Sequence, residues 1–374
     1  MARELILANP TPDESRQTWT CTHPLWGAAL SLDGYILRET RQADLPLARD
    51  GGLRPWVLVE ADSQPDSRDI LSSCETLRKR ALVRRPDGEV SEVIAHGVAS
   101  VFTDPAFRGK GHASTMMARL GETLQAEGAL LSVLWSDIGK EFYNKHGWRP
   151  FESDHLEFPV PAQQEDGDAP QPPASVTIVR YDDIPQLAAA DERLIRRAIS
   201  RPPASPGKTT RVAILPDAAT LQWHVLRDAA QCENILGRTP TSHGAVYTTP
   251  SGRRVWAIWR RNHSAPPSQP EKNTFYILRL VVEDEDEATI PDDELRGALE
   301  AIVAAAKSEA RDWACGTVHL WNPEPRVRSL AEGSAKLGAR LVSRESDSVT
   351  SLRWFGDGDV DSVEWLANEK FAWC

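Results

Sequence analysis

The sequence predicts an α/β (α+β) protein with two domains. Three observations lead to this prediction: the length of the chain, an alternation of strands and helices around a glycine-rich turn in the N-terminal half, and a similar alternation after a proline-rich stretch. With 374 residues, the chain exceeds one ordinary domain and suffices for two, each with its own core. A composition of 41% hydrophobic and 26% charged residues is typical of globular rather than disordered proteins.

The proline-rich stretch marks the expected domain boundary. Residues 158–175 (FPVPAQQEDGDAPQPPAS) carry five prolines and show no apolar periodicity, which is typical of an extended linker. We therefore expect a first domain at residues 1–158, a linker at residues 159–175 and a second domain at residues 176–374.

Apolar patterning predicts the elements of the first domain in order. Short apolar runs predict strands at residues 5–7, 56–59 and 81–83, and the segment 13–39 is expected to be helical. There follow a strand at 92–103, a glycine turn at 109–113, a helix at 114–126, a strand at 129–135 and a helix at 139–146. This order predicts an α/β unit with the turn at the end of its sheet. One face of the first of these helices is apolar and is assigned to the core: Met116, Met117, Leu120 and Leu124.

The second domain is predicted to be a degenerate structural repeat of the first. Strands are expected at 254–259, 275–282, 316–321 and 349–354, and helices at 293–312 and 327–337. The segment 131–137 (LSVLWSD) parallels the segment 317–323 (TVHLWNP). Where the first domain has its glycine turn, the second has the acidic segment 285–291 (EDEATIP). An acidic loop repels a pyrophosphate, so the second domain is not expected to bind a cofactor. The acidic run 283–287 is otherwise expected to be a solvated loop.

Charge and composition exclude several classes of protein. A net charge of −11 disfavours binding to nucleic acid, because phosphate neutralisation needs clustered Lys and Arg, and it favours a cationic partner. The chain shows no 18-residue apolar run and no signal or transit peptide at its start, so we expect no membrane partner and a cytoplasmic location. The cysteines are odd in number and lack metal-ligand spacing, which indicates reduced thiols and no metal: Cys21, Cys74, Cys232, Cys315 and Cys374.

The glycine turn has the chemistry of a phosphate site. A tight turn at a helix N-terminus leaves several backbone N–H groups unpaired, and the helix dipole adds partial positive charge. Glycines let the backbone approach a ligand closely, basic side chains add charge, and a hydroxyl adds a donor. The residues expected to hold phosphate are Arg108, Gly109, Lys110, Gly111, His112, Ala113 and Ser114. The plainer interpretation is an ordinary strand-to-helix turn.

The surroundings of the turn carry a family resemblance. Pro105-Ala-Phe-Arg-Gly-Lys-Gly111 follows a predicted strand, and Phe142-Tyr-Asn-Lys-His-Gly-Trp148 comes later. Residues 5 to 158 thereby resemble the GNAT superfamily of acyl-CoA N-acyltransferases, whose pattern combines a "P-x-x-R-G-x-G" turn with an "F-Y-x-x-x-G-[FW]" helix end. The resemblance implies that the turn binds the pyrophosphate of acetyl-CoA and that Val101, Phe102 and Thr103 bind the pantetheine arm.

The same resemblance implies that Tyr143 protonates the departing thiolate, although a core aromatic beside Phe142 is the alternative. The chain departs from the family at Ser136, where Asn is frequent, and Ser136 is expected to replace the missing hydrogen bond to the cofactor. A closer likeness, carried by the segments 70–76, 98–113, 134–140 and 364–374, is to the fungal L-lysine N6-acetyltransferase family. It implies acetyl transfer to the ε-amine of free L-lysine, a step in lysine catabolism.

Attack on a thioester needs a neutral amine, so a base must remove a proton. A lysine ε-amine is neutral only about one time in a thousand at neutral pH. The candidates for the base are Glu75, His96 and Asp137. Each has a structural alternative: a solvent-facing strand residue for Glu75, a histidine bonded to a neighbouring strand for His96, and a helix cap for Asp137.

Two further questions stay open at the level of sequence. The aromatic segment at the end of the chain (WLANEKFAWC) is expected to be packed down, either lining the acceptor site or only completing the core of the second domain. The rival functions are acetylation of another small amine, such as a polyamine, drug or toxin, and acyl-CoA binding without catalysis.

Overall fold

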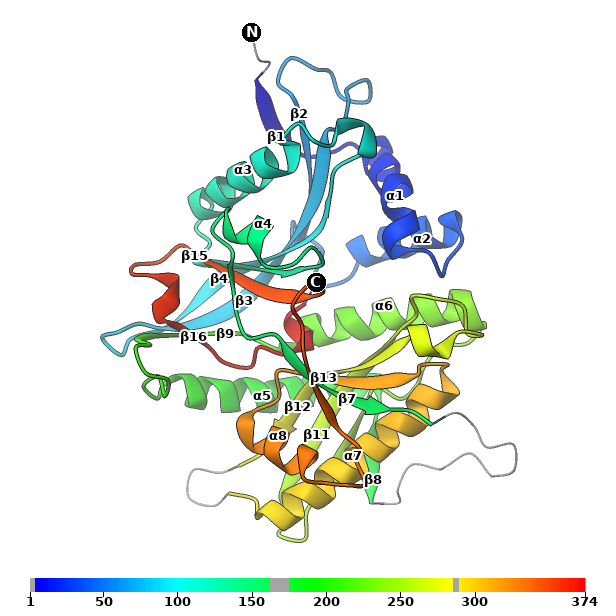
Figure 1. Cartoon of the computed structure of the whole chain (residues 1–374), viewed down its shortest axis with the longest axis vertical. Helices are drawn as coiled ribbons and strands as arrows, with labels where there is room; N and C mark the ends of the chain where they lie inside the picture. The colour runs from blue at the N-terminus through cyan, green and yellow to red at the C-terminus, as the bar shows by residue number, and fades with distance from the viewer. Residues whose placement is uncertain (1–3, 162–174, 285–288, 374) are drawn as a thin grey trace.

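The computed structural model describes residues 4–161, 175–284 and 289–373. Most of the expected linker (162–174) and part of the acidic run (285–287) lie outside the described residues. Figure 1 shows two sheets stacked along the long axis of the molecule, with the N-terminal elements at one end and the C-terminal segment returning to the junction between them.

The first sheet contains the elements predicted for the N-terminal half. Its main path runs β1-β2-β3-β4-β5-β15-β6, and β9 joins its edge by pairing with β3 and β16. The bounds are β1 Leu5–Ala8, β2 Leu53–Glu60, β3 Ser72–Arg84, β4 Val90–Phe102, β5 Leu131–Ser136, β6 Arg149–Pro150, β9 Thr210–Ile214, β15 Val349–Trp354 and β16 Val363–Trp365.

The second sheet has the order β14-β7-β13-β12-β11-β10-β8. Its strands are β7 Asp154–Pro159, β8 Val176–Val179, β10 Gly244–Thr248, β11 Arg254–Asn262, β12 Thr274–Val282, β13 Thr317–Trp321 and β14 Arg340–Ser343. The segments β7, β8, β9, β10, β14 and β16 were not predicted as strands from the sequence.

The two halves exchange equivalent strands. β15 lies between β5 and β6 and is antiparallel to both, whereas β7 lies between β13 and β14 and is antiparallel to both. Each sheet is therefore completed by a strand from the other side of the expected linker. The division into residues 1–158 and 176–374 stays a prediction about the chain, because the sheets themselves are shared across it.

Helices cover both sheets. Their bounds are α1 Pro12–Trp26, α2 Leu32–Ala43, α3 His112–Ala126, α4 Glu141–Asn144, α5 Ile184–Ile199, α6 Ala218–Leu236, α7 Asp292–Asp312 and α8 Pro325–Glu332. The helical segment expected at 13–39 is two helices, and that expected at 139–146 is only the single turn of α4. The four apolar residues of α3 are fully buried, as predicted.

In each sheet, two neighbouring parallel strands separate at corresponding positions. The parallel pairing of β4 with β5 ends at Val98↔Leu134, and that of β12 with β13 ends at Ile277↔Leu320. β4 and β12 also each show a register shift against the preceding strand close to the split. This shared geometry supports the interpretation of the second half as a repeat of the first.

Candidate active site

The glycine turn connects β4 to α3 and is built for an anion. Gly109 and Gly111 have φ of 77° and 81°, a region that favours glycine. Gly111 is the N-cap of α3, and no described side chain caps the helix, so the N–H groups at His112, Ala113 and Ser114 and the positive end of the helix dipole are left for a ligand. A Cβ on either glycine would meet none of the described atoms within 4 Å, so the turn faces open space.

The basic side chains of the turn are held close to it. Arg108 Nε donates to the carbonyl of Thr103 at 3.0 Å, and Lys110 Nζ lies 5.6 Å from the ring centre of Phe107. These contacts keep two positive charges beside the unpaired amides, where a pyrophosphate would benefit from both.

The split between β4 and β5 lies next to the turn. Beyond Val98, β4 continues through a residue with φ of 54°, Ser100, to Val101, Phe102 and Thr103 without pairing to β5. Backbone groups on this side of β4 are therefore available to an extended ligand such as a pantetheine arm.

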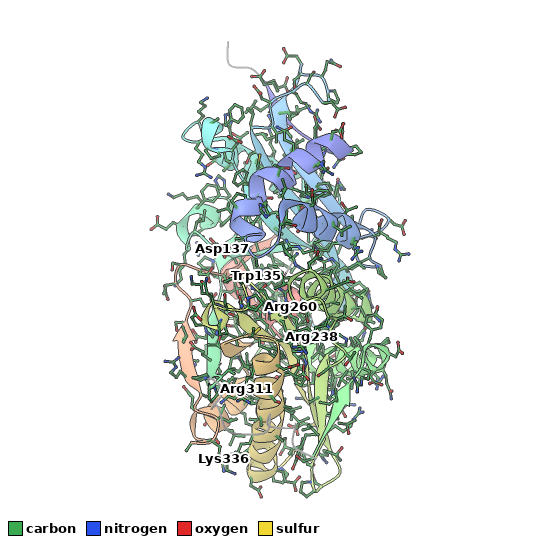
Figure 2. The ribbon with its side chains drawn as sticks, turned by 90° about the vertical axis from the view of Figure 1, so that its right-hand side faces the viewer. Trp135, Asp137, Arg238, Arg260, Arg311 and Lys336 are labelled. Atoms are coloured by element: carbon green, nitrogen blue, oxygen red, sulfur yellow. The ribbon has the colours of Figure 1, made fainter. Side chains whose placement is uncertain are left out.

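A cavity of about 450 Å³ opens from the split and lies between the two halves. The size is within the usual range for small-molecule sites. The first half contributes parts of α1, α2, β3, β4 and the end of β5, and the second half contributes α6, the ends of β11 and β12, the segment before β15, and the C-terminal residues Lys370 and Trp373. In Figure 2, Trp135 and Asp137 lie at the level where the halves meet, with Arg260 of the second half just beyond them.

Glu75 lies in the wall of this cavity, on β3. Its carboxylate accepts hydrogen bonds from Ser100 Oγ at 3.4 Å and from the Trp19 side chain. Burial, followed by the nearby negative charge of Glu39, raises the pKa of Glu75 to about 7, while Arg227 lowers it. A carboxyl with this pKa can accept a proton near neutral pH.

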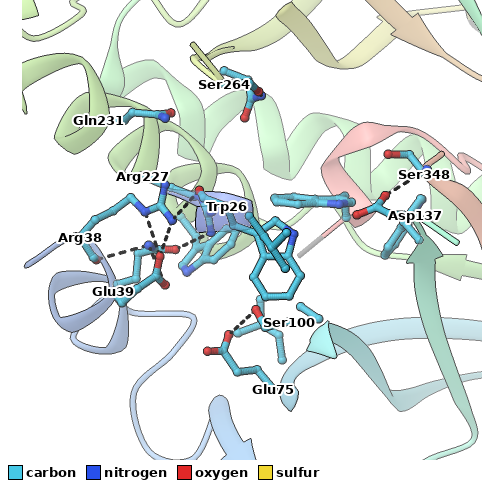
Figure 3. A pocket seen from close by; sticks show the side chains of 18 of the residues that line it. Trp26, Arg38, Glu39, Glu75, Ser100, Asp137, Arg227, Gln231, Ser264 and Ser348 are labelled. Atoms are coloured by element: carbon cyan, nitrogen blue, oxygen red, sulfur yellow. Dashed lines mark hydrogen bonds and ion pairs between the residues drawn. The ribbon is translucent and has the colours of Figure 1, made fainter. Parts of the chain in front are cut away.

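Asp137 lies at the other side of the cavity, after β5 (Figure 3). It accepts a hydrogen bond from the backbone N–H of Ser348 at 3.2 Å, and its carboxyl also shares a hydrogen bond with Asp347. Burial and then Asp347 raise the pKa of Asp137 to about 6. Its described partners belong to the segment before β15, so the structure gives no support to the alternative of a local helix cap.

Lys370 is buried beside this carboxyl pair. Its Nζ lies 4.0 Å from the ring centres of Trp321 and Trp373 and 4.6 Å from that of Tyr276. Burial lowers the pKa of Lys370 well below its usual value, whereas the charges of the two carboxyls oppose that shift. The end of the chain therefore lines the cavity, which answers one question that the sequence left open.

The remaining predicted residues lie near the cavity but do not line it. Tyr143 is buried in α4 and belongs to the same apolar cluster as Val98 and Leu134, the last pair before the split. Burial raises its pKa above the usual value, so its hydroxyl stays protonated at neutral pH. Ser136 donates to the carbonyl of Gly139 at 2.6 Å and accepts from the N–H of Ile138, so its hydroxyl serves the local turn.

His96 lies on the paired part of β4, opposite Arg78 and Ser132. Burial, together with the charges of Arg54 and Arg78, lowers its pKa to about 4. The side chain is thus neutral near pH 7, but it is not among the residues that line the cavity.

Several cavity residues were missed by sequence analysis: Arg38, Glu39, Gln42, Arg227, Gln231, Asp347 and Lys370. They come from α2, α6, the segment between β14 and β15, and the end of the chain, and nothing in their local sequence distinguishes them from ordinary polar surface residues.

The second half has a corresponding split that its own tail fills. Glu369 accepts a hydrogen bond from the backbone N–H of Leu280 at 2.9 Å, and the tail residue Asn368 accepts through its carbonyl from the side chain of Asn322. Leu280 lies as far beyond the last β12–β13 pair as Val101 lies beyond the last β4–β5 pair, so the two positions correspond. The carboxylate thus takes the N–H that a pantetheine arm would need, a second reason, beside the acidic loop, to expect no cofactor there.

One group of described residues has the composition of a metal site: His155, Glu157 and His319. The two imidazoles stack with ring centres 4.2 Å apart, and Glu157 forms an ion pair with Arg340. The possible ligand atoms of the three side chains lie within 4.8 Å of one another on the adjacent strands β7 and β13, and the Glu157 carboxylate is already engaged by Arg340. None of the described helices is long and apolar enough to span a membrane.

Comparisons with known proteins agree with this geometry. The model of the LYC1 GNAT-like C-terminal domain matches residues 155–374, and that of the acetyltransferase (GNAT) domain matches residues 88–151. A protein of Yarrowia lipolytica named lysine acetyltransferase is 33% identical over 158 residues, which cover 37% of this chain and only 38% of that protein.

Solved structures with a similar fold have low sequence identity. A GCN5-related N-acetyltransferase from Kribbella flavida has 17% identity and a TM-score of 0.52, covering 94% of this chain and 71% of its own. The N-myristoyltransferase of Saccharomyces cerevisiae with bound myristoyl-CoA has 9% identity and a TM-score of 0.52, covering 94% and 79%. These likenesses show the fold alone.

Proposed function

Because this chain belongs to the family defined by the LYC1 GNAT-like C-terminal domain, we propose that it is an acetyl-CoA-dependent N-acetyltransferase that acts on the N6 amine of free L-lysine. Its GNAT fold, predicted from the sequence, is confirmed by the family models and the similar structures. The observation that carries the proposal is the cavity at the β4–β5 split, which holds buried carboxyls and a guanidinium on opposite sides.

The cofactor side of the proposal uses the turn and the split. The unpaired amides at the start of α3, with Arg108 and Lys110, bind the pyrophosphate, and Val101 to Thr103 pair with the pantetheine arm. Acetyl-CoA supplies an activated thioester. This arrangement directs the acetyl group towards Ser100 and the cavity.

The acceptor side needs a base for the ammonium group. We assign this role to Glu75, since its pKa of about 7 leaves it able to accept a proton at physiological pH and it faces the cavity. The neutral amine then attacks the carbonyl carbon, so a C–N bond forms as the C–S bond breaks. Tyr143, kept protonated by burial, donates a proton to the thiolate leaving group, and the proton that the attacking nitrogen loses as the amide forms restores the Tyr143 hydroxyl.

Asp137 has a different assignment. Burial and then Asp347 raise its pKa to about 6, so Asp137 is mostly ionised near pH 7, and its negative charge stabilises an ammonium group near the thioester before deprotonation. His96 and Ser136 receive no catalytic or cofactor-binding role in this proposal, because they do not line the cavity or have their polar atoms engaged locally.

A cavity of about 450 Å³ favours a small acceptor over a protein chain. Polyamines fit the carboxyls equally well but have no use for a buried guanidinium. If the fold were retained only for acyl-CoA binding, the raised pKa values of Glu75 and Asp137 would serve no reaction.

The test is thiol release from acetyl-CoA by the purified protein across a panel of amines: L-lysine, ornithine, spermidine and a histone-tail peptide. We expect the highest kcat/KM with L-lysine and N6-acetyllysine as the product by mass spectrometry. Preference for another amine would reject lysine while keeping the transferase. Tight binding of acetyl-CoA with no turnover of any amine would reject the transferase activity.

A further inference from the structure

We propose that Arg227, oriented by Gln42, binds the carboxylate of the acceptor and thereby selects amino acids with a distal amine over simple diamines. The inference rests on the proposed transfer of acetyl to a small amine and assigns the acceptor's second anchor.

Arg227 has an unusual environment for a guanidinium inside a protein. It lies on α6 and lines the cavity. Gln42 of α2 accepts one hydrogen bond from its Nη1 at 2.8 Å, and its guanidinium carbon lies 5.6 Å and 5.5 Å from the ring centres of Trp223 and Trp373. No carboxylate of the described residues lies within the 4.0 Å of an ion pair with Arg227.

Other buried arginines have the carboxylate partner that Arg227 lacks. Arg279 binds Asp191 through two hydrogen bonds of 2.8 Å, Arg261 pairs with Asp228, and Arg38 pairs with Glu39. Arg260, like Arg227, has an amide oxygen as its hydrogen-bond acceptor, that of Asn262, but it does not line the cavity. Of the two described arginines that line the cavity, Arg38 and Arg227, Arg227 is the one without a carboxylate partner, so its remaining donors can be reached by a ligand.

Burial of a cation without an anion is costly, and an incoming carboxylate removes that cost. Burial and the neighbouring Arg38 already lower the pKa of Arg227 to about 9, in keeping with a site that gains from a negative partner. The two indole faces fix the plane of the guanidinium, so its fork of donors is ready for bidentate contact with a carboxylate.

The position of Arg227 also suits the reaction. Its charge is close enough to lower the pKa of Glu75, yet the two side chains do not pair. In Figure 3, Arg227 lies on the side of the pocket with Arg38 and Glu39, whereas Asp137 lies on the opposite side, with Glu75 between them. An acceptor anchored by its carboxylate at Arg227 extends its distal amine across Glu75 towards the split.

The first experiment needs no variant. The wild-type protein is assayed with L-lysine and with L-lysinamide, in which the carboxylate is replaced by a neutral amide. We expect kcat/KM to fall by roughly 10- to 150-fold for the amide, the range for a hydrogen bond to a charged group. Equal values for the two acceptors would overturn the proposal.

The second experiment uses Arg227→Gln with L-lysine and with 1,5-diaminopentane, which lacks the carboxylate. Because Arg227 also lowers the pKa of Glu75, both acceptors are assayed at a pH above this pKa, where Glu75 is ionised in either protein. We expect KM for L-lysine to rise by a similar factor, whereas kcat/KM for the diamine stays within about threefold. Arg227→Lys should restore part of the lysine activity. Arg41→Gln, an exposed arginine of α2 paired with Glu233, is the matched control and should change neither value.

Failure of this inference is distinguishable from failure of the proposed function. If the wild-type protein acetylates no amine, the proposed transferase activity itself is rejected. If it acetylates L-lysine and Arg227→Gln lowers turnover of both acceptors equally, the transferase stands and the carboxylate site is rejected.

Discussion

Replacing Glu75 by Gln is expected to abolish most activity while making the protein more stable at alkaline pH. The substitution keeps the shape of the side chain and removes its ability to accept a proton. Loss of a general base typically costs about 10²- to 10⁴-fold in rate. We expect that fall in kcat/KM for L-lysine, with binding of acetyl-CoA unchanged.

The stability change follows from the pKa. Folding raises the pKa of Glu75 from 4.5 to about 7, so the folded protein holds a proton that the unfolded chain has already lost. The cost of ionising the buried carboxyl is absent below pH 4.5, grows between pH 4.5 and 7, and is complete above pH 7. A shift of this size corresponds to about 3 kcal/mol, and Gln avoids that cost at pH 8.

The pH profile gives the decisive readout. For the wild-type protein, kcat/KM should rise with pH through a limb near 7 as Glu75 ionises. Glu39→Gln removes the nearby negative charge that raises this pKa, so the limb should move to lower pH. A profile of Glu75→Gln that keeps the wild-type limb, or a Glu39→Gln limb that does not move, would refute the assignment of Glu75 as the base. Urea unfolding at pH 5 and pH 8 measures the stability difference.

Three other substitutions test separate parts of the site. Gly111→Val places a β-branched residue at φ 81° in the turn, and we expect calorimetry to detect no acetyl-CoA binding; unchanged affinity would exclude the turn as the pyrophosphate site. Tyr143→Phe should slow turnover by about 10²- to 10⁴-fold with acetyl-CoA affinity retained, and full activity would remove it from the acid role. Glu369→Ala leaves Arg279 and the N–H of Leu280 without their tail partner, so urea unfolding should show a loss of about 3–5 kcal/mol, and a loss below about 1 kcal/mol would show that the tail is held by other contacts.

The parts of the fold that depend on local chemistry could be predicted from the sequence. The turn at Gly109 and Gly111, the buried face of α3 and the strand before the turn follow from glycine placement and from periodicity. Glu75 and Asp137 were named because a base was needed, and both line the cavity. His96 was named on the same grounds but lies on the part of β4 that pairs with β5. The sequence alone could not show how far along β4 this pairing extends.

The parts that depend on pairing over long distances could not be predicted. β7 and β15 are both short strands of mixed apolar and polar residues, and each sheet has a gap that either strand could fill by antiparallel pairing. No local pattern therefore decides which strand enters which sheet. Arg227 and Glu39 belong to helices whose positions follow from that pairing. Their role is visible only once α2 and α6 face each other across the cavity.

The strand exchange also explains why the second half lines the cavity at the β4–β5 split even though its own split is filled. Val349, the first residue of β15, pairs with Ser136, the last residue of β5, so the residues just before β15 lie against those just after β5. That register brings Asp347 and Ser348 onto Asp137, where burial, and then Asp347, raise the pKa of this carboxyl. A first half that kept its own β7 in this place would present Asp137 with different neighbours. The acidic side of the cavity around Asp137 is thus a product of the strand exchange, and the first half cannot assemble it alone.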